Sequence, residues 1–162
     1  MIAFGHTAVG VIVGVTAYQF LGQGNLASGL IITGSMGMIS HYLMDAVPHG
    51  HFSISKNYKQ SILPIIIFDL SLPIIFFLRT IYLNDGFGEK LLYAVFGIGG
   101  SQLPDVIAGL IYIKVIKNKG LLKAEDDLHE ALHWQGKSSR LLLLGWLDIW
   151  QILIILAALF KV

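Results

Sequence analysis

Five long apolar stretches constrain what this chain can fold into more than any other feature. A helix that crosses the hydrocarbon core of a bilayer needs about 20 apolar residues, with roughly 17 to 25 tolerated. The stretches that meet this length cover residues 2–21, 26–47, 62–78, 91–116 and 141–160 of the 162. Charged residues make up only 13% of the chain, about half of their usual share in soluble domains. We therefore predict an all-α fold: one transmembrane domain over 1–162, a polytopic integral membrane bundle of about five spans.

The connections between these stretches are short, and one of them has a pattern of its own. Residues 22–25 are expected to form a tight hairpin between the first two spans. Residues 117–137 are too polar for the hydrocarbon, yet apolar side chains recur in them, which predicts an interfacial helix at about 121–134. No Lys or Arg precedes the first stretch and no clear cleavage site follows it, so we expect a retained helix rather than a signal peptide.

The basic residues predict the orientation, because positively charged loops stay in the cytoplasm. Three of the eleven lie on one side of the predicted bundle, namely Arg79, Lys90 and Lys161. The other eight lie on the side that holds the N-terminus: Lys56, Lys59, Lys114, Lys117, Lys119, Lys123, Lys137 and Arg140. We expect a multi-pass protein of the cell (inner) membrane with a cytoplasmic N-terminus and an external C-terminus. A net charge of +1 gives no basic face for nucleic acid, so membrane lipid is the expected partner.

Ionisable side chains inside the predicted spans point to a site. Each costs roughly 2.5 to 3.5 kcal/mol on insertion scales, so each needs a partner or a function. Counted from the cytoplasmic end of each span, they lie within roughly 3 to 17 Å of that face at 1.5 Å per residue, and a common cavity can hold them all. The residues concerned are His6, His41, Asp45, Asp69, Asp105 and Asp148.

Spacing along the helices supports this convergence and indicates a metal site. His41 and Asp45 are four residues apart and share a helix face, which His49 would continue if the helix runs on past Pro48. The chain has no cysteine, so a metal must bind nitrogen and oxygen, as zinc does, with manganese or iron as alternatives. One or two divalent ions are expected on these metal ligands: His6, His41, Asp45, His49, Asp105, His129 and His133. Glu130 and Asp69 are the candidate catalytic residues, while His51 and Asp148 stay open.

The sequence HEALH at 129–133 matches the HExxH pattern. In that pattern two histidines bind zinc from one helix face and the glutamate activates water. With Asp148 as a third ligand it would suit an intramembrane zinc protease, although Ile149 stands where that family has glycine after the aspartate. We keep the protease as an alternative.

Glycine and proline mark where helices should meet. Gly10 and Gly14 form a GxxxG pattern in the first span, which favours close helix packing in lipid. Pro104 removes a backbone donor next to Asp105, so the fourth span should kink there and a carbonyl should seek another partner.

Several motifs together resemble a known family. They are the first-span histidine, ISHYLMDAVPHGH at 39–51, SQLPD at 101–105, HEALHW at 129–134 and a final span with Gln151. The set, which covers nearly the whole chain, resembles the bacterial and archaeal membrane-bound metal-dependent hydrolases, small polytopic membrane proteins. The resemblance implies a metal-dependent hydrolase.

The leading hypothesis is therefore a membrane hydrolase with a His/Asp metal site at the cytoplasmic face, acting on a lipid or phosphoester. A metal or proton transporter is a further alternative, since intramembrane Asp and His also line ion pathways. It would place these groups near the midplane, whereas here they stay in the cytoplasmic half. If the polar groups only hydrogen-bond neighbouring helices, the protein should bind no metal.

Overall fold

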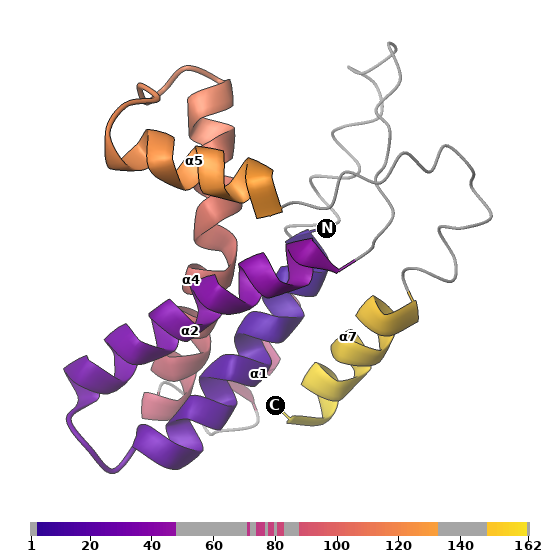
Figure 1. Cartoon of the computed structure of the whole chain (residues 1–162). Coiled ribbons are helices and arrows are strands. Elements are labelled where there is room, and N and C mark those ends of the chain that lie inside the picture. Colours follow the sequence, from indigo (N-terminus) through magenta and orange to yellow (C-terminus); the bar gives the residue numbers. More distant parts are fainter. Residues whose placement is uncertain are drawn as a thin grey trace.

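The computed structural model describes residues 3–47, 71, 74–76, 78–79, 81–82, 88–132 and 149–161. Its principal elements are α1 (Ala3–Leu21), α2 (Leu26–Ala46), α4 (Glu89–Tyr112), α5 (Leu121–Leu132) and α7 (Ile149–Lys161) (Figure 1). No strand occurs in this described part, which confirms the predicted all-α class there. The helices α1, α2 and α4 pack on one another, α7 packs on α1, and α5 contacts α2 and α4.

Helices α1 and α2 form the hairpin that the sequence predicts. The amide of Gly22 donates to the carbonyl of Tyr18 at 2.8 Å, and that of Gly24 donates to Leu21 at 2.9 Å, which closes the first helix. Asn25 caps the second, because its side-chain oxygen accepts from the amide of Ser28 at 3.1 Å.

Helix α2 ends at Ala46, just before the C-terminal boundary of the span predicted over 26–47. Val47 is extended, with φ −76° and ψ 136°, because the residue before a proline is pushed out of the helical region. The helix therefore ends at Ala46, whereas the prediction that His49 continues the face of His41 and Asp45 required a longer helix. His49 itself lies outside the described residues.

Glycines bring α1 and α2 against α4 at the distance of backbone contact. A Cβ on Gly14 would lie 2.5 Å from the Cα of Ala94, and one on Gly10 would lie 2.7 Å from the Cα of Ile98. On the other side of α4, a Cβ on Gly37 would lie 3.0 Å from the amide nitrogen of Ser101. The predicted role of the GxxxG pattern in helix packing is thus confirmed, and α4 is held between two glycine-lined helices.

Apolar packing anchors α1 from its other side. Ala8, Val11 and Val15 form a buried cluster with Ala94 of α4 and with Ala158 of α7. The predicted last span, over 141–160, corresponds to α7 from Ile149 onward, and residues 141–148 lie outside the described part.

Helix α4 continues through Pro104 and ends at Tyr112, before the predicted boundary at 116. Lys114 adopts a positive φ of 60°, which no helix accommodates, and Gly120 adopts the same φ just before α5 begins. The short connection lets α5 lie against α2 and α4 (Figure 1). Helix α5 covers most of the predicted interfacial helix at 121–134.

Two described helices, Leu26–Ala46 and Glu89–Ile111, are long and apolar enough to cross a membrane. The apolar part of α1, Gly5–Leu21, is shorter than either of these two helices. The predicted span at 62–78 is described at residues 71, 74–76 and 78 alone, which are helical. The described part therefore supports two possible spans rather than five.

Candidate metal centre

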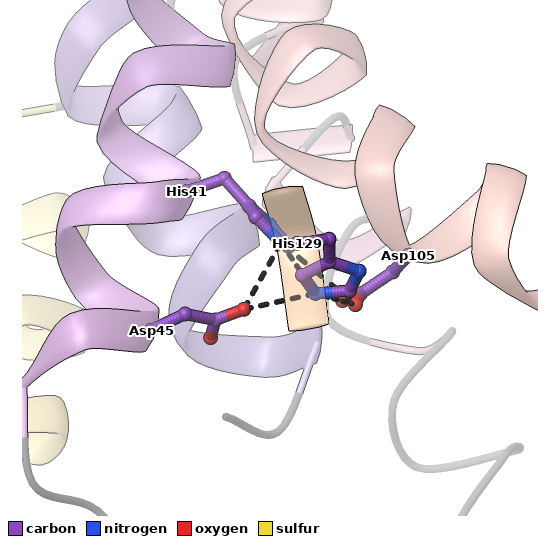
Figure 2. A group of neighbouring side chains, drawn as sticks. All are labelled: His41, Asp45, Asp105 and His129. Carbon is purple, nitrogen blue, oxygen red and sulfur yellow. Dashed lines mark hydrogen bonds and ion pairs between the residues drawn. The ribbon is translucent and has the colours of Figure 1, made fainter. Parts of the chain in front are cut away.

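Four ionisable side chains from three helices meet at one end of the bundle. His41 and Asp45 come from α2, Asp105 from α4 and His129 from α5, and they point toward one another (Figure 2). We call this group the His/Asp cluster. One ligand atom from each residue lies within 4.8 Å of all the others. Residues up to 88 positions apart in the chain thus form a group that can hold a metal ion.

Three members of the cluster form a nearly equilateral triangle of atoms. The Nε2 of His41 and Oδ2 of Asp45 are 3.2 Å apart, and the Nε2 of His129 lies 3.1 Å from the same oxygen. The two Nε2 atoms are 3.3 Å apart. The Oδ1 of Asp105 lies somewhat farther away, at 3.6 Å from the nitrogen of His129 and 3.9 Å from that of His41.

The backbone of α4 orients the ring of His41. Its Nδ1 lies 2.7 Å from the carbonyl oxygen of Ser101, which can only accept, so Nδ1 carries the hydrogen and donates. A neutral His41 then has its lone pair on Nε2, directed into the cluster, as in metal-binding histidines. Pro104 cannot donate to Gly100, and the next carbonyl, that of Ser101, is the one that accepts from His41.

His6 of α1 supports the cluster from outside. Its Nε2 lies 3.1 Å from Oδ1 of Asp45, the carboxylate oxygen turned away from the triangle, and donates to it. Its ring stacks on that of His41 with centroids 3.9 Å apart. Predicted as a ligand, His6 lies outside the group of four and holds two of its members in position.

Polar contacts hold α5 in place. His129 is buried, and Tyr42 of α2 donates a hydrogen bond to Glu125 of α5 at 3.0 Å. Hydrogen bonding to the Asp45 carboxylate raises the pKa of His129, against the opposite effect of its burial.

The spacing of the cluster matches that of metal ligands. A tetrahedral zinc ion, with bonds of about 2.0 to 2.2 Å, keeps its ligand atoms about 3.3 to 3.6 Å apart. The three triangle edges, at 3.1 to 3.3 Å, lie close to this value, and the Oδ1 of Asp105 lies farther out, at 3.6 and 3.9 Å from the two Nε2 atoms. Imidazole and carboxylate donors also suit manganese and iron, so the cluster can hold a divalent ion whose identity the donors leave open.

The cluster is closed on one side and accessible on the other. His41 and Asp45 are at most 1% exposed, whereas the side chain of Asp105 is 37% exposed. Water and small groups can therefore approach the cluster beside Asp105.

The remaining predicted site residues fall into two groups. Glu130 lies on the exposed surface of α5 next to the buried His129, and its predicted catalytic role stays a prediction. Asp69, His49, His51, His133 and Asp148 lie outside the described residues. The protease alternative depends on His133 and Asp148, so it too stays a prediction.

Sequence reasoning missed the groups that orient the ligands. The carbonyl of Ser101 has no side-chain signature, although its position in the SQLPD motif was a signal. Tyr42, beside His41 in the sequence, was likewise not assigned a role. A further contact between α4 and α1 is the hydrogen bond that the side-chain amide of Gln102 donates to the hydroxyl of Thr7 at 2.8 Å.

Comparison of the chain with protein-family models, with curated proteins and with solved structures found no match.

Proposed function

We propose that this chain is an integral membrane metal-dependent hydrolase that cleaves an ester or phosphoester bond of a membrane lipid. The triangle of His41, Asp45 and His129 carries this proposal, because two imidazoles and one carboxylate are a donor set of catalytic zinc sites. Such sites keep a fourth position for water or substrate. The motifs that resemble the membrane-bound metal-dependent hydrolases contain all three residues.

The surface of the two long helices supports a place in the membrane. The apolar core helix of a soluble protein is mostly buried, but only 22% of the window in α2 and 28% of that in α4 is buried. Large apolar side chains such as Ile31, Leu43 and Val106 are more than half exposed. Lipid is the medium that such a surface requires, and with the other apolar stretches it supports the five-span arrangement.

The basic residues support a cytoplasmic site. His6 lies near the start of α1, while His41 and Asp45 lie near the end of α2, so the cluster sits at the N-terminal side of the bundle. The connection that follows α4 on this side carries Lys114, Lys117 and Lys119. A site at this end would lie beside the headgroups of the inner leaflet.

The residues of the His/Asp cluster have different roles in the proposed hydrolysis. A bound divalent ion would polarise the scissile group and acidify the attacking water. His41, Asp45 and His129 would hold it, with His41 oriented by the carbonyl of Ser101. Both oxygens of Asp45 are already bonded, whereas Asp105 is partly exposed and farther from its neighbours.

Asp105 is therefore the carboxylate placed to accept the proton of the attacking water. Water adds to the acyl carbon or phosphorus as its proton passes to Asp105, and the ester bond breaks as Asp105 returns that proton to the oxygen of the leaving alcohol. Zinc is the ion we propose.

Elemental analysis of the detergent-purified full chain, after incubation with zinc or manganese, tests the proposal. We expect about one equivalent of metal in the wild type and in Asp127→Asn, an exposed carboxylate of α5 that serves as the matched control. His41→Ala and Asp45→Asn should lose the metal. Asp105→Asn should keep it but hydrolyse phospholipid in phosphatidylethanolamine–phosphatidylglycerol vesicles about 10² to 10⁴ times more slowly. Metal-free wild-type protein would refute the proposal.

A further inference from the structure

An apolar groove lies between α2 and α4. It has a volume of about 550 Å³, and its lining includes Ile31, Gly34 and Met38 of α2 and Phe96, Gly99 and Leu103 of α4. The glycines make the space. A Cβ on Gly99 would meet no atom within 4 Å, and one on Gly34 would touch only Phe96, at 3.7 Å or more. The volume is within the range of sites that bind small ligands, about 300 to 1,000 Å³.

The lining excludes a charged or hydrogen-bonding occupant. No Lys, Arg, Asp, Glu or His is among the lining residues of the described part. The one hydroxyl, that of Ser35, already donates to the carbonyl of Ile31 at 2.9 Å. A peptide strand or a lipid headgroup would leave its polar groups unpaired here, at a cost in free energy. A hydrocarbon chain has no such groups.

The groove is continuous with the surface that the proposed function assigns to lipid. Ile31, Phe96 and Leu103 on its walls are 42 to 67% exposed, so a chain can enter sideways from the bilayer. Along α2 the groove ends about one helical turn before the cluster, because Met38 lies three residues before His41 and on the same side of the helix.

We propose that the groove holds an acyl chain of the substrate lipid, so that the ester or phosphoester at its head reaches the cluster. This inference rests on the proposed function and specifies its substrate: a lipid that is bound by one hydrocarbon chain and recognised at its head by the metal centre. A second copy of this chain packed against the groove is the competing occupant.

Photolabelling with a lipid tests the groove directly. The probe is a phosphatidylethanolamine that carries a diazirine in the middle of one acyl chain, reconstituted with the full-length protein in phosphatidylethanolamine–phosphatidylglycerol vesicles. Labelled peptides are mapped by mass spectrometry. Gly99→Leu fills the groove, and Gly109→Leu is the matched control, since it makes the same change on α4 at a glycine outside the groove where a Cβ also meets nothing.

We expect saturable labelling of the peptides that contain residues 30–38 and 95–103, above that of other exposed apolar surfaces such as Leu43 and Leu153. Gly99→Leu should abolish this excess, and Gly109→Leu should retain it. Equal labelling of all apolar surfaces in the wild type would overturn the proposal without any variant. So would crosslinks between two protein chains at the groove.

Metal content measured on the same samples separates this proposal from the proposed function. Groove labelling in a metal-free protein would leave the acyl site standing and refute the hydrolase. A metal-loaded protein without preferential labelling would refute the acyl site and leave the metal centre standing. Gly99→Leu should keep its metal, because Gly99 touches no member of the cluster, and its metal content therefore shows that the variant is folded.

Discussion

The crossing of α1 and α4 at Gly97 allows a quantitative test of the packing. A Cβ added there would contact the carbonyl oxygen of Gly10 and lie 2.9 Å from the amide nitrogen of Gly14. Ordinary contacts of a Cβ begin at 3.4 Å, so the second distance alone requires a shift of about 3.4 − 2.9 = 0.5 Å. Both neighbours are backbone atoms, which cannot rotate away, so in Gly97→Ala the two helices must separate.

Overpacking of this kind costs about 1 to 3 kcal/mol. The control is Gly109→Ala on the same helix, where the new Cβ meets no atom within 4 Å. It should gain the higher helix propensity of alanine, about 0.8 to 1 kcal/mol. We therefore expect the two variants to differ by about 2 to 4 kcal/mol in the free energy of unfolding, with Gly97→Ala the less stable.

Unfolding of the purified protein by titration with dodecyl sulfate, followed by circular dichroism, measures this difference. In a thermal melt it corresponds to roughly 4 to 16 °C for a chain of this length. If Gly97→Ala is as stable as Gly109→Ala, then α1 and α4 do not touch at this glycine, and the reasoning about the crossing is refuted.

Three further outcomes follow from the contacts of the cluster and of α5. His6→Phe keeps an aromatic ring but loses the donor to Asp45, so the affinity for zinc, measured by competition with a chromophoric chelator, should fall about 10- to 100-fold; an unchanged affinity would contradict the supporting role. Lys123→Ala removes an ion pair with Asp127 in which both side chains are more than half exposed, and the unfolding midpoint should not move. Hydrogen bonding to Asp127 raises the pKa of Lys123, so the pair is charged at neutral pH. A clear change in the unfolding midpoint of Lys123→Ala would therefore contradict the expectation that this exposed pair adds little stability. Removal of metal with a chelator should increase proteolysis of the α4–α5 connection at 113–120; equal cleavage rates with and without metal would mean that the ion does not hold α5 in place.

Periodicity and hydropathy could predict the helices because each rests on local sequence. The pair His41 and Asp45 was predictable for the same reason, since four residues place two side chains on one helix face. That Asp105 joins them followed from its depth in the predicted fourth span, and that His129 does followed from its place in the predicted interfacial helix. The structure confirms that the four side chains come together. Spacing alone cannot give the difference of a few tenths of an ångström that sets Asp105 apart from the triangle.

The position of His6 shows what sequence patterns cannot reach. A buried histidine at the depth of the ligands looks like another ligand, but its Nε2 faces the outer oxygen of Asp45. Only the relative placement of α1 and α2 decides this, and that placement depends on backbone contacts with α4 at glycines. The boundaries of α2 and α4 differ from the predicted spans for a more local reason, namely the extended Val47 before a proline and the positive φ of Lys114.

The way the cluster is built links metal binding to the docking of α5. Helices α1, α2 and α4 are fixed to one another by close backbone contacts, and they position His41, Asp45 and Asp105 whether or not an ion is bound. Helix α5 makes far fewer contacts with them. Its buried residue is His129, and the partly buried Tyr42–Glu125 hydrogen bond also joins it to α2. An ion that binds His129 together with the preformed part adds its binding energy to the docking of α5. Because linkage is reciprocal, any change that loosens α5 must weaken metal binding by the same factor. The metal centre we propose is therefore complete only when α5 is docked.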